Sequence, residues 1–516
     1  MKQVSILNNV IGPIMRGPSS SHTAGPWRIG RLAKDLLGSK PCKATFLMDP
    51  TSSLAICYHD QGSDLALVAG LLGKDLTDPD FFEVLDLAPK MGLSVSFKLE
   101  KFPEADHPNS LLVVLEAKDG SSVRLHAKSV GGGSIEITSV DGCPVLIKGD
   151  RHEILIEATP GTEEQIIQLL KQWTENIEKT TCDNKLTLHG SSPFEPSSDL
   201  IDILKKSQLA KKLKYARPVM FPLAGKELFR DLKHLLELAN ENDWSLGETA
   251  LFYEHEILKL PIDFLNSEME KRLHLMLDAV EEGLKNEKIS MKLLRPTAKK
   301  IMEAEERGKV FLGGTHLKAA ARAMAAMHVS SSGGVVCAAP TGGSAGLIPG
   351  VMATLIKDMG LSKTEAVRSL WAAGAIGLLL DQRSTFAAEV AGCQVEIGAA
   401  GAMAAAAIVE AAGGKASQAC DAASILFQNV MGSVCDLIQG IVEIPCHTRN
   451  AALASQAFLC ADLILGGYQN LVPLDETIDA VDSVGRMLPE ELRCTSRGGI
   501  AVCPSALALP RLDLKN

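Results

Sequence analysis

The first 150 residues alternate short apolar runs of strand composition with segments of helical spacing. Residues 43–49 and 111–117 are rich in the aliphatic, aromatic and β-branched residues that favour strands. Residues 63–73 place apolar side chains three and four positions apart, as an amphipathic helix does. The glycines at 131–133 indicate a turn that leads into another strand. The pattern predicts an α+β domain over residues 1–150.

A smaller unit is expected over residues 151–210. Its pattern predicts a strand at 152–158, a helix at 161–177, a strand at 185–190 and a serine-capped helix at 197–207. We interpret the order of these elements as βαββα.

From about residue 215 to residue 510, strand patterns nearly vanish and helical periodicity dominates. Three segments in this part, 319–327, 371–380 and 398–414, consist almost entirely of alanine, glycine and other apolar residues. Small residues let helix backbones approach closely, and a helix without a polar face is typical of a buried position. The sequence therefore predicts a large all-α domain with these segments at its centre.

Composition and charge narrow the class of protein. The chain has 516 residues, of which 46% are hydrophobic and 22% charged, so two or three globular domains are expected. The net charge of −10 includes no long basic run, which argues against nucleic acid and anionic membranes as partners. The N-terminus lacks the apolar region of a signal peptide, and the apolar stretch 396–412 is interrupted by Glu396 and Glu410. We expect a cytoplasmic protein without membrane spans.

The chain has twelve cysteines and no CxxC pair. Zinc is therefore poorly supported, and disulfides are not expected in a reducing compartment. Cys393, Cys435 and Cys446 differ from the others because glycine, proline or polar residues flank them. Their spacing matches no ferredoxin signature, so spacing alone favours a structural role over an iron–sulfur cluster.

Two polar segments could bind an anion. Residues 16–26, "RGPSSSHTAGP", place three serines, His22 and a threonine between two Gly-Pro pairs. Residues 337–350 place Thr341 and Ser344 among glycines before an apolar helix, where main-chain N–H groups suit a carboxylate or phosphate. Arg449 could clamp a carboxylate. From the residues alone, an ordinary capped loop and a surface arginine remain open as alternatives.

Several motifs together resemble a known family. The segments "GPSSSHTAGP", "SVGGGSIEI", "AAPTGGSAGLIPG", "CDLIQGIVEIPCHTRNA" and "LPEELRCTSRGGIAV" are similar to successive landmarks of the iron–sulfur-dependent L-serine dehydratases. The first two resemble that family's β part and the others its helical α part. The resemblance covers most of the chain and implies both parts fused in one polypeptide.

The resemblance implies a [4Fe-4S] cluster held by Cys393, Cys435 and Cys446. An iron without a protein thiolate could then act as a Lewis acid on the substrate hydroxyl. Cys494 and Cys503 are the nearest possibilities for a fourth ligand at rest. The unit at 151–210 is similar to an ACT-like regulatory domain.

The resemblance also assigns roles to the two polar segments and to Arg449. His22 would transfer the proton, since an imidazole suits acid–base chemistry near neutral pH. The expected catalytic residues are His22 and Ser21, and the expected substrate-binding residues are Ser19, Ser20, Thr23, Thr341, Ser344 and Arg449.

Departures from the family pattern bear on the substrate. The chain reads "HVSSSGG" at 328–334 where many serine-specific relatives read roughly Asn-x-Ser/Ala-Met-Gly. It has Asp60–Asp64 in place of Gly-His-Gly-Thr-Asp, and "CDLI" in place of Cys-Asp-Pro-Val. Two substrates therefore stay open. These are 2-(hydroxymethyl)glutarate, which would give 2-methyleneglutarate and is slightly favoured by the departures, and L-serine, which would give pyruvate and ammonia.

Two other classes of function predict different features. An iron–sulfur redox or sensor module would hold its cluster with four fixed ligands. A pyridoxal-phosphate dehydratase is a poor fit, because no Schiff-base lysine motif stands beside the glycine-rich loop at 341–346. We expect a lyase of anaerobic metabolism that acts on a small hydroxy acid and forms a homo-oligomer.

Overall fold

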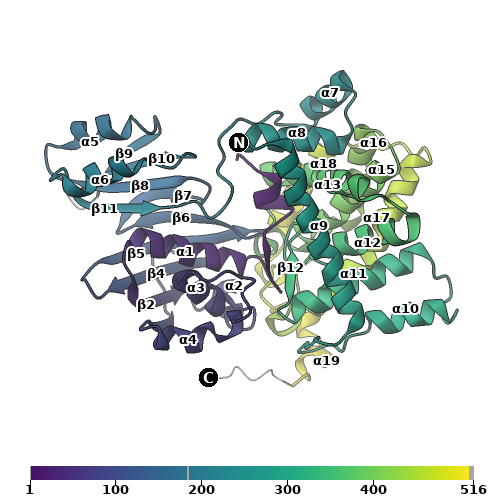
Figure 1. Ribbon diagram of the computed structural model, residues 1–516. Helices are drawn as coiled ribbons and strands as arrows, with labels where there is room; N and C mark the ends of the chain where they lie inside the picture. Colours follow the sequence, from purple (N-terminus) through teal and green to yellow (C-terminus); the bar gives the residue numbers. More distant parts are fainter. Residues whose placement is uncertain (1, 183–184, 511–516) are drawn as a thin grey trace.

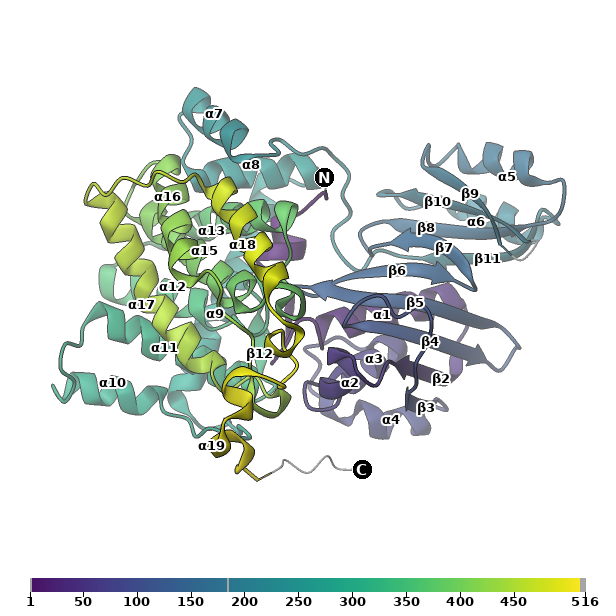
Figure 2. The same cartoon turned by 180° about the vertical axis from the view of Figure 1, so that it is seen from behind.

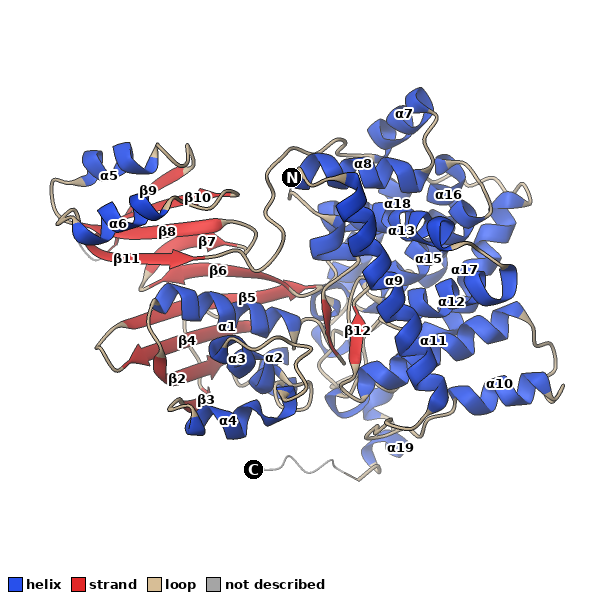
Figure 3. Cartoon of the chain, viewed as in Figure 1, coloured by secondary structure: helices blue, strands red, loops and turns tan. Residues whose placement is uncertain are grey.

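The computed structural model describes residues 2–182 and 185–510 and shows a strand-rich N-terminal region beside a large helical part (Figures 1 and 3). The coarse fold prediction, an N-terminal region of strands and helices followed by a helical C-terminal part, is confirmed.

The N-terminal region contains a six-stranded mixed sheet, with α1–α4 on one of its faces (Figures 1 and 2). The pair β2–β3 is parallel and the other pairs are antiparallel. In sheet order the strands are β3 (Ser94–Leu99), β2 (Pro41–Met48), β4 (Ser110–Ala117), β5 (Ser122–Gly131), β6 (Ser134–Val140) and β7 (Cys143–Ile147). The helices are α1 (Ala24–Leu37), α2 (Ser53–Cys57), α3 (Ser63–Leu72) and α4 (Val84–Lys90).

The small unit has one strand more than the predicted βαββα order, and the helix expected at 161–177 is shorter, because α5 ends at Leu170 and β9 begins at Ile177. Its sheet order is β11-β8-β10-β9, all antiparallel, and the chain order is βαββαβ. The extra strand, β11, carries four charged or polar side chains in seven residues, so its sequence lacks a strand-like apolar run. The elements are β8 (His152–Ala158), α5 (Glu163–Leu170), β9 (Ile177–Cys182), β10 (Lys185–Ser192), α6 (Ser198–Lys206) and β11 (Ala210–Ala216). The likeness of this unit to an ACT domain stays a prediction.

The helical part surrounds the alanine-rich helix α15. Its longer helices are α7 (Leu232–Asn242), α8 (Leu246–Leu258), α9 (Ile262–Lys285), α10 (Ala298–Glu306), α11 (Thr315–Ser331), α12 (Leu347–Met359), α13 (Lys363–Arg383), α15 (Ile397–Ala411), α16 (Ala416–Val430), α17 (Cys446–Leu465) and α18 (Leu474–Met487). Shorter helices are α14 (Ala388–Ala391) and α19 (Pro504–Leu507). A capping box, in which Ser362 and Glu365 each accept a hydrogen bond from the other's main-chain N–H, fixes the start of α13.

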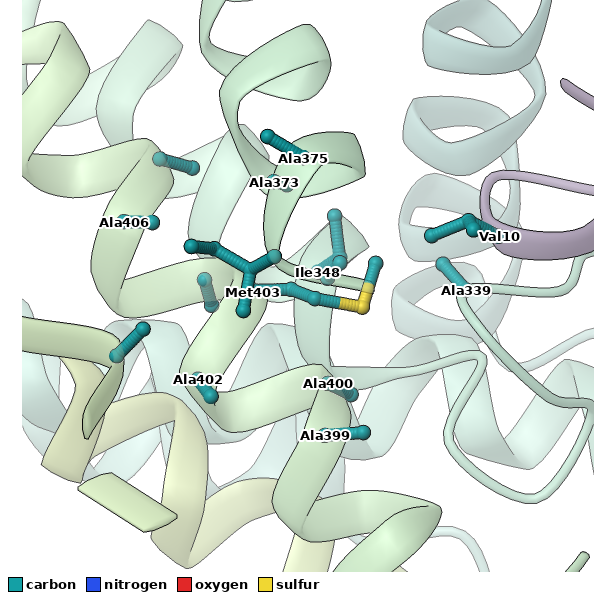
Figure 4. Close-up of a cluster of buried hydrophobic side chains, with 14 of the residues drawn as sticks. Val10, Ala339, Ile348, Ala373, Ala375, Ala399, Ala400, Ala402, Met403 and Ala406 are labelled. Atoms are coloured by element: carbon teal, nitrogen blue, oxygen red, sulfur yellow. The ribbon is translucent and has the colours of Figure 1, made fainter. Parts of the chain in front are cut away.

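The segment Cys393–Ala411 is the one helix, among the described residues, that is long and apolar enough to cross a membrane by length and composition. In this structure 94% of that segment is buried inside the protein. Ala399, Ala402 and Met403 of α15 lie in a cluster of buried apolar side chains (Figure 4). The segment is therefore the core helix that the small-residue pattern predicts.

The first residues of the chain lie in the helical part. The short π-helix Ile6–Val10 is buried against α13, where a Cβ on Gly377 would lie 2.2 Å from Val10 Cγ1. Figure 4 shows Val10 at the edge of the apolar cluster around Met403. Strand β1 (Ile14–Arg16) then pairs antiparallel with β12 (Val335–Cys337). The chain thus enters the N-terminal region only after it has packed against the helices.

Candidate active site

Three buried cysteines from separate elements meet at one end of the helical part. Cys393 lies in the short 3-10 turn Cys393–Val395, Cys435 follows α16, and Cys446 begins α17. The exposed fraction of each is 5% or less. The Sγ atoms of Cys393 and Cys435 and a carboxylate oxygen of Glu396 lie within 4.8 Å of one another. We call Cys393, Cys435 and Cys446 the thiol side of the site.

Main-chain contacts hold Cys435 in place. Its N–H donates to Leu492 O at 2.9 Å, and its carbonyl accepts from Cys494 N at 2.8 Å. Cys494 is also buried and has a left-handed φ of 63°. The C-terminal segment therefore fixes Cys435 and places another thiol next to the thiol side.

Arg449 ties together the turns that carry the cysteines. Its guanidinium donates to Val434 O at 2.7 Å and to Asp436 Oδ1 at 3.0 Å, and it lies 3.6 Å from Cys393 Sγ. The sequence predicts a carboxylate clamp at this arginine. The structure places it beside the thiols with its donors engaged by the protein, and its role toward a substrate stays a prediction.

The thiols are poised for metal binding rather than for free reactivity. Burial raises the pKa of the Cys446 thiol well above its ordinary value. The pKa of Cys393 is raised by its hydrogen bond with Cys435 and by burial. A bound cation can replace these protons, because metal sites select the thiolate form. The nearby Arg449 guanidinium also compensates thiolate charge.

The loop of residues 17–23, the serine–histidine loop, is held against the helical part. The β1–β12 pair sets its start, and a Cβ on Gly17 would lie 2.1 Å from Ser330 O. Ser20 Oγ accepts a hydrogen bond from Gly342 N at 3.3 Å. Thr23 Oγ1 donates to Ser19 O at 2.7 Å. Two of the predicted substrate-binding hydroxyls therefore support the loop itself.

His22 is fully buried within this loop. Its Nδ1 lies 3.2 Å from Ser19 Oγ, whereas its Nε2 has no hydrogen-bond partner among the described residues. Burial lowers the pKa of the ring below its ordinary value of 6.5, although the charge of Glu389 opposes the shift. The ring is therefore neutral at pH 7 with one nitrogen available. The Ser21 hydroxyl, also predicted to act, makes no hydrogen bond to the part of the chain described.

The Thr341–Ser344 turn faces the thiol side through Glu396. Thr341 Oγ1 donates to Glu396 Oε1 at 2.5 Å and lies 3.0 Å from Ser344 Oγ. Burial raises the pKa of Glu396 to about 7, although the Thr341 hydrogen bond opposes the shift. The structure thus brings this turn to the site, with both hydroxyls bonded inside the protein. Their role toward a substrate stays a prediction.

Two carboxylates were missed as site residues by the sequence reasoning. Glu389 lies in α14, 3.9 Å from His22 Nδ1, and Glu396 lies beside Cys393 and Cys435. Both flank Cys393 in the run "AEVAGCQVEIG", which holds no other charged residue. Charges placed in an apolar segment are the signal that could have revealed them, since such residues are rarely buried without a function or a partner.

The N-terminal region supplies further groups. Asn109 Nδ2 donates to Glu389 Oε1 at 3.2 Å, and Ser53 Oγ donates to Cys494 O at 3.4 Å. Cys57 is buried within reach of the Glu389 charge, and burial raises the pKa of its thiol to about 12. The site is therefore assembled from both halves of the chain.

Comparisons with known proteins identify the family of the chain. The sequence model of the family described as "Serine dehydratase alpha chain" matches residues 161–501. The chain is 35% identical over 284 residues to the probable L-serine dehydratase alpha chain of Bacillus subtilis, covering 55% of this chain and 95% of that protein. It is 38% identical over 288 residues to the L-serine dehydratase alpha chain of Peptoniphilus asaccharolyticus, covering 55% and 97%.

A further relative extends the similarity to the N-terminal region. The chain is 25% identical over 502 residues to the L-serine dehydratase of Haemophilus influenzae, covering 94% of this chain and 96% of that protein. Both halves of the site therefore fall within the matched length. The chain belongs to the serine dehydratase family and is a dehydratase, a carbon–oxygen hydro-lyase.

Proposed function

We propose that the protein is a [4Fe-4S]-dependent dehydratase that removes water from a small β-hydroxy carboxylate. The observation that carries the proposal is the grouping of buried thiols around Cys393 and Cys435, with Glu389 lying between this group and the buried His22. A hydro-lyase needs a base for the α proton and an acid for the departing hydroxide, and this arrangement offers candidates for both.

The residues present fit an iron–sulfur cluster. Three thiols supply soft ligands of the kind that iron–sulfur clusters use. Cys393 and Cys435 lie together, and Cys446 lies close enough to Cys393 for their charges to interact. The nearby Arg449 offsets thiolate charge. We infer that Cys393, Cys435 and Cys446 hold the cluster. When bound, the cluster supplies the Lewis acid for the leaving hydroxyl.

The chain's own residues would manage the proton and the carboxylate. His22 Nε2 is the unpaired base, and Ser19 Oγ holds the opposite nitrogen and so orients the ring. The N–H groups of His22 and Thr23 and the Thr23 hydroxyl all donate to Ser19 O within the loop. The Ser21 hydroxyl and the main-chain N–H groups of residues 19–21 would therefore bind the substrate carboxylate. Because burial keeps His22 neutral, it can accept the proton from the carbon next to the carboxylate at neutral pH.

L-Serine is the substrate that the relatives favour. Proteins named L-serine dehydratase match this chain along almost its whole length. Loss of water would give an enamine, which tautomerises and takes up water to yield pyruvate and ammonia. The second candidate is 2-(hydroxymethyl)glutarate, which the departures at 328–334 and at Asp60–Asp64 favour.

Three further properties belong to the same proposal. The protein would act in the cytoplasm, as a homo-oligomer, on a small-molecule hydroxy acid. The βαββαβ unit would serve as an ACT-like regulatory domain, since its sheet and two helices stand apart from the catalytic site (Figure 2).

An anaerobic assay tests the proposal. The protein is purified without oxygen, its iron and sulfide are measured, and it is incubated with each substrate while ammonia and alkene are quantified. We expect a brown protein that loses activity in air and releases ammonia from L-serine. A colourless or aldimine-yellow protein that remains active would overturn the cluster. A spectrum that does not respond to either substrate would support the redox or sensor alternative.

A further inference from the structure

Glu389 is a buried carboxylate without a strong partner. Its exposed fraction is 6%, and within the described residues its carboxyl group accepts one hydrogen bond, from Asn109 Nδ2 at 3.2 Å. Buried carboxylates are normally paired with a cation or held by several N–H donors, because an unpaired buried charge is costly. Glu254, equally buried, shows the usual arrangement, with Ser5 Oγ and two main-chain N–H groups donating to it.

No permanent cation compensates Glu389. Among the residues that the structure describes, no lysine or arginine forms an ion pair with it, and the nearest ring nitrogen is His22 Nδ1 at 3.9 Å. That nitrogen is beyond hydrogen-bond distance from Glu389 and lies 3.2 Å from Ser19 Oγ. Burial also lowers the pKa of His22, so its ring carries no charge at neutral pH. Among the described residues, the Glu389 carboxyl group therefore has no fixed cation beside it.

The Glu389 side chain lies between the serine–histidine loop and the thiol side. A negative charge on Glu389 favours the protonated forms of the neighbouring titratable groups, which are His22, His107, Cys57, Cys494 and Glu396. The amide of Asn109 that bonds Glu389 also carries a buried oxygen, Oδ1, with no hydrogen-bond partner among the described residues. The Glu389 carboxyl group and Asn109 Oδ1 are thus two hydrogen-bond acceptors that lie together in the proposed site.

We propose that Glu389 and Asn109 Oδ1 bind the α-ammonium group of the substrate, and that this pair selects an amino acid over a hydroxy acid that lacks the amino group. An ammonium has three donors and a full positive charge, which matches a carboxylate and a neighbouring carbonyl oxygen. A substrate without nitrogen leaves Glu389 unpaired in a buried site. The inference rests on the proposed function and assigns its substrate class as L-serine.

The experiment compares two compounds that differ only in the ammonium group. The cluster-loaded enzyme is assayed anaerobically for kcat and KM with L-serine, and for the inhibition constant of 3-hydroxypropionate against L-serine. Glu389→Gln keeps the shape of the side chain but removes its charge. We expect KM for L-serine to rise about 10- to 100-fold, the range of a charge-assisted hydrogen bond, while the 3-hydroxypropionate constant changes less than about threefold.

A matched variant and a second substitution sharpen the test. Glu116→Gln makes the same change of charge at a half-exposed position on β4 and should leave both constants unchanged. Asn109→Ala should give the same selective loss, which keeps the inference testable if Glu389→Gln does not fold. Equal loss for both compounds, or a fall in kcat without a selective rise in KM, would overturn the inference by making Glu389 a base or a structural group.

The outcomes separate this inference from the proposed function. If the wild-type protein has no cluster or releases no ammonia from L-serine, the proposed function fails. If it does both and Glu389→Gln retains iron content and L-serine affinity, only the role of Glu389 and Asn109 fails.

Discussion

The thiol side and the serine–histidine loop obtain their rigidity from different sources. The cysteines sit on turns between core helices, fixed by main-chain bonds to the C-terminal segment and by Arg449. The loop belongs to the N-terminal region, yet a two-stranded ladder and the close approach of Gly17 to Ser330 attach it to the helices. Cluster binding should therefore depend on the cysteine thiols, and the position of the serine–histidine loop should depend on the packing of its backbone against the helices.

The largest effect should come from removing a thiol. Cys435→Ser should lower iron content and reduce dehydration below detection, because a serine hydroxyl is a poor substitute for a thiolate on iron. Metal analysis and an anaerobic ammonia assay measure both changes. Cys420→Ser, a buried cysteine on α16 away from the site, is the matched control. Full activity in Cys435→Ser would remove the cluster assignment.

Substitutions in the serine–histidine loop should reduce turnover without loss of iron. His22→Ala should keep the iron content while kcat falls about 100- to 10,000-fold, the usual contribution of a general base. In the wild-type enzyme, kcat should fall only when the pH drops below the ordinary histidine value of 6.5, because burial lowers the pKa of His22 and its neutral form is the active one. That acidic limb should be absent from the residual activity of the variant. Loss of iron from His22→Ala would instead make the histidine structural.

A buried histidine that packs on His447, the residue after Cys446, should make stability depend on pH. His328 on α11 has two buried ring nitrogens without partners among the described residues, and burial lowers its pKa to about 4. The unfolded chain takes up this proton near pH 6.5, so the stability that the neutral ring supports above pH 6.5 is lost as the pH falls toward 4. The loss is at most about 3 kcal/mol. Denaturant titrations of wild type and His328→Leu between pH 7 and 4 measure it, and parallel curves would contradict the prediction.

The smallest effect should come from disturbing the contact between the serine–histidine loop and Ser330. Gly17→Ala places a methyl group against Ser330 O and should cost about 2 kcal/mol of stability, the usual range for overpacking. Turnover should fall while bound iron is retained, because the loop moves and the thiols do not. Gly120→Asn, in an exposed turn with no atom near its Cβ position, is the control. If Gly17→Ala loses iron, the two sides are not independent.

The thiol side was more predictable from sequence than the groups between the two sides. The family motifs carry the cysteines and the serine–histidine loop; the structure places Glu396 beside Cys393 and Cys435, and Glu389 beside His22. Glu389 and Asn109 are 280 residues apart, and only the tertiary fold makes them neighbours. Periodicity predicted the core helix α15, whereas β11 was missed because three lysines in seven residues leave it without an apolar run. Local patterns predict elements, but pairing across the two halves depends on packing between them.

The course of residues 4–16 has a consequence for assembly. This segment packs in the helical core, and its strand β1 pairs with β12 of the helical part. The helical part therefore depends on residues from the start of the chain. In one polypeptide the segment is presented to its groove at an effective concentration on the order of millimolar. A cut between the small unit and α7 would turn that contact into an association between two molecules. Completion of the active site would then follow mass action and fail on dilution.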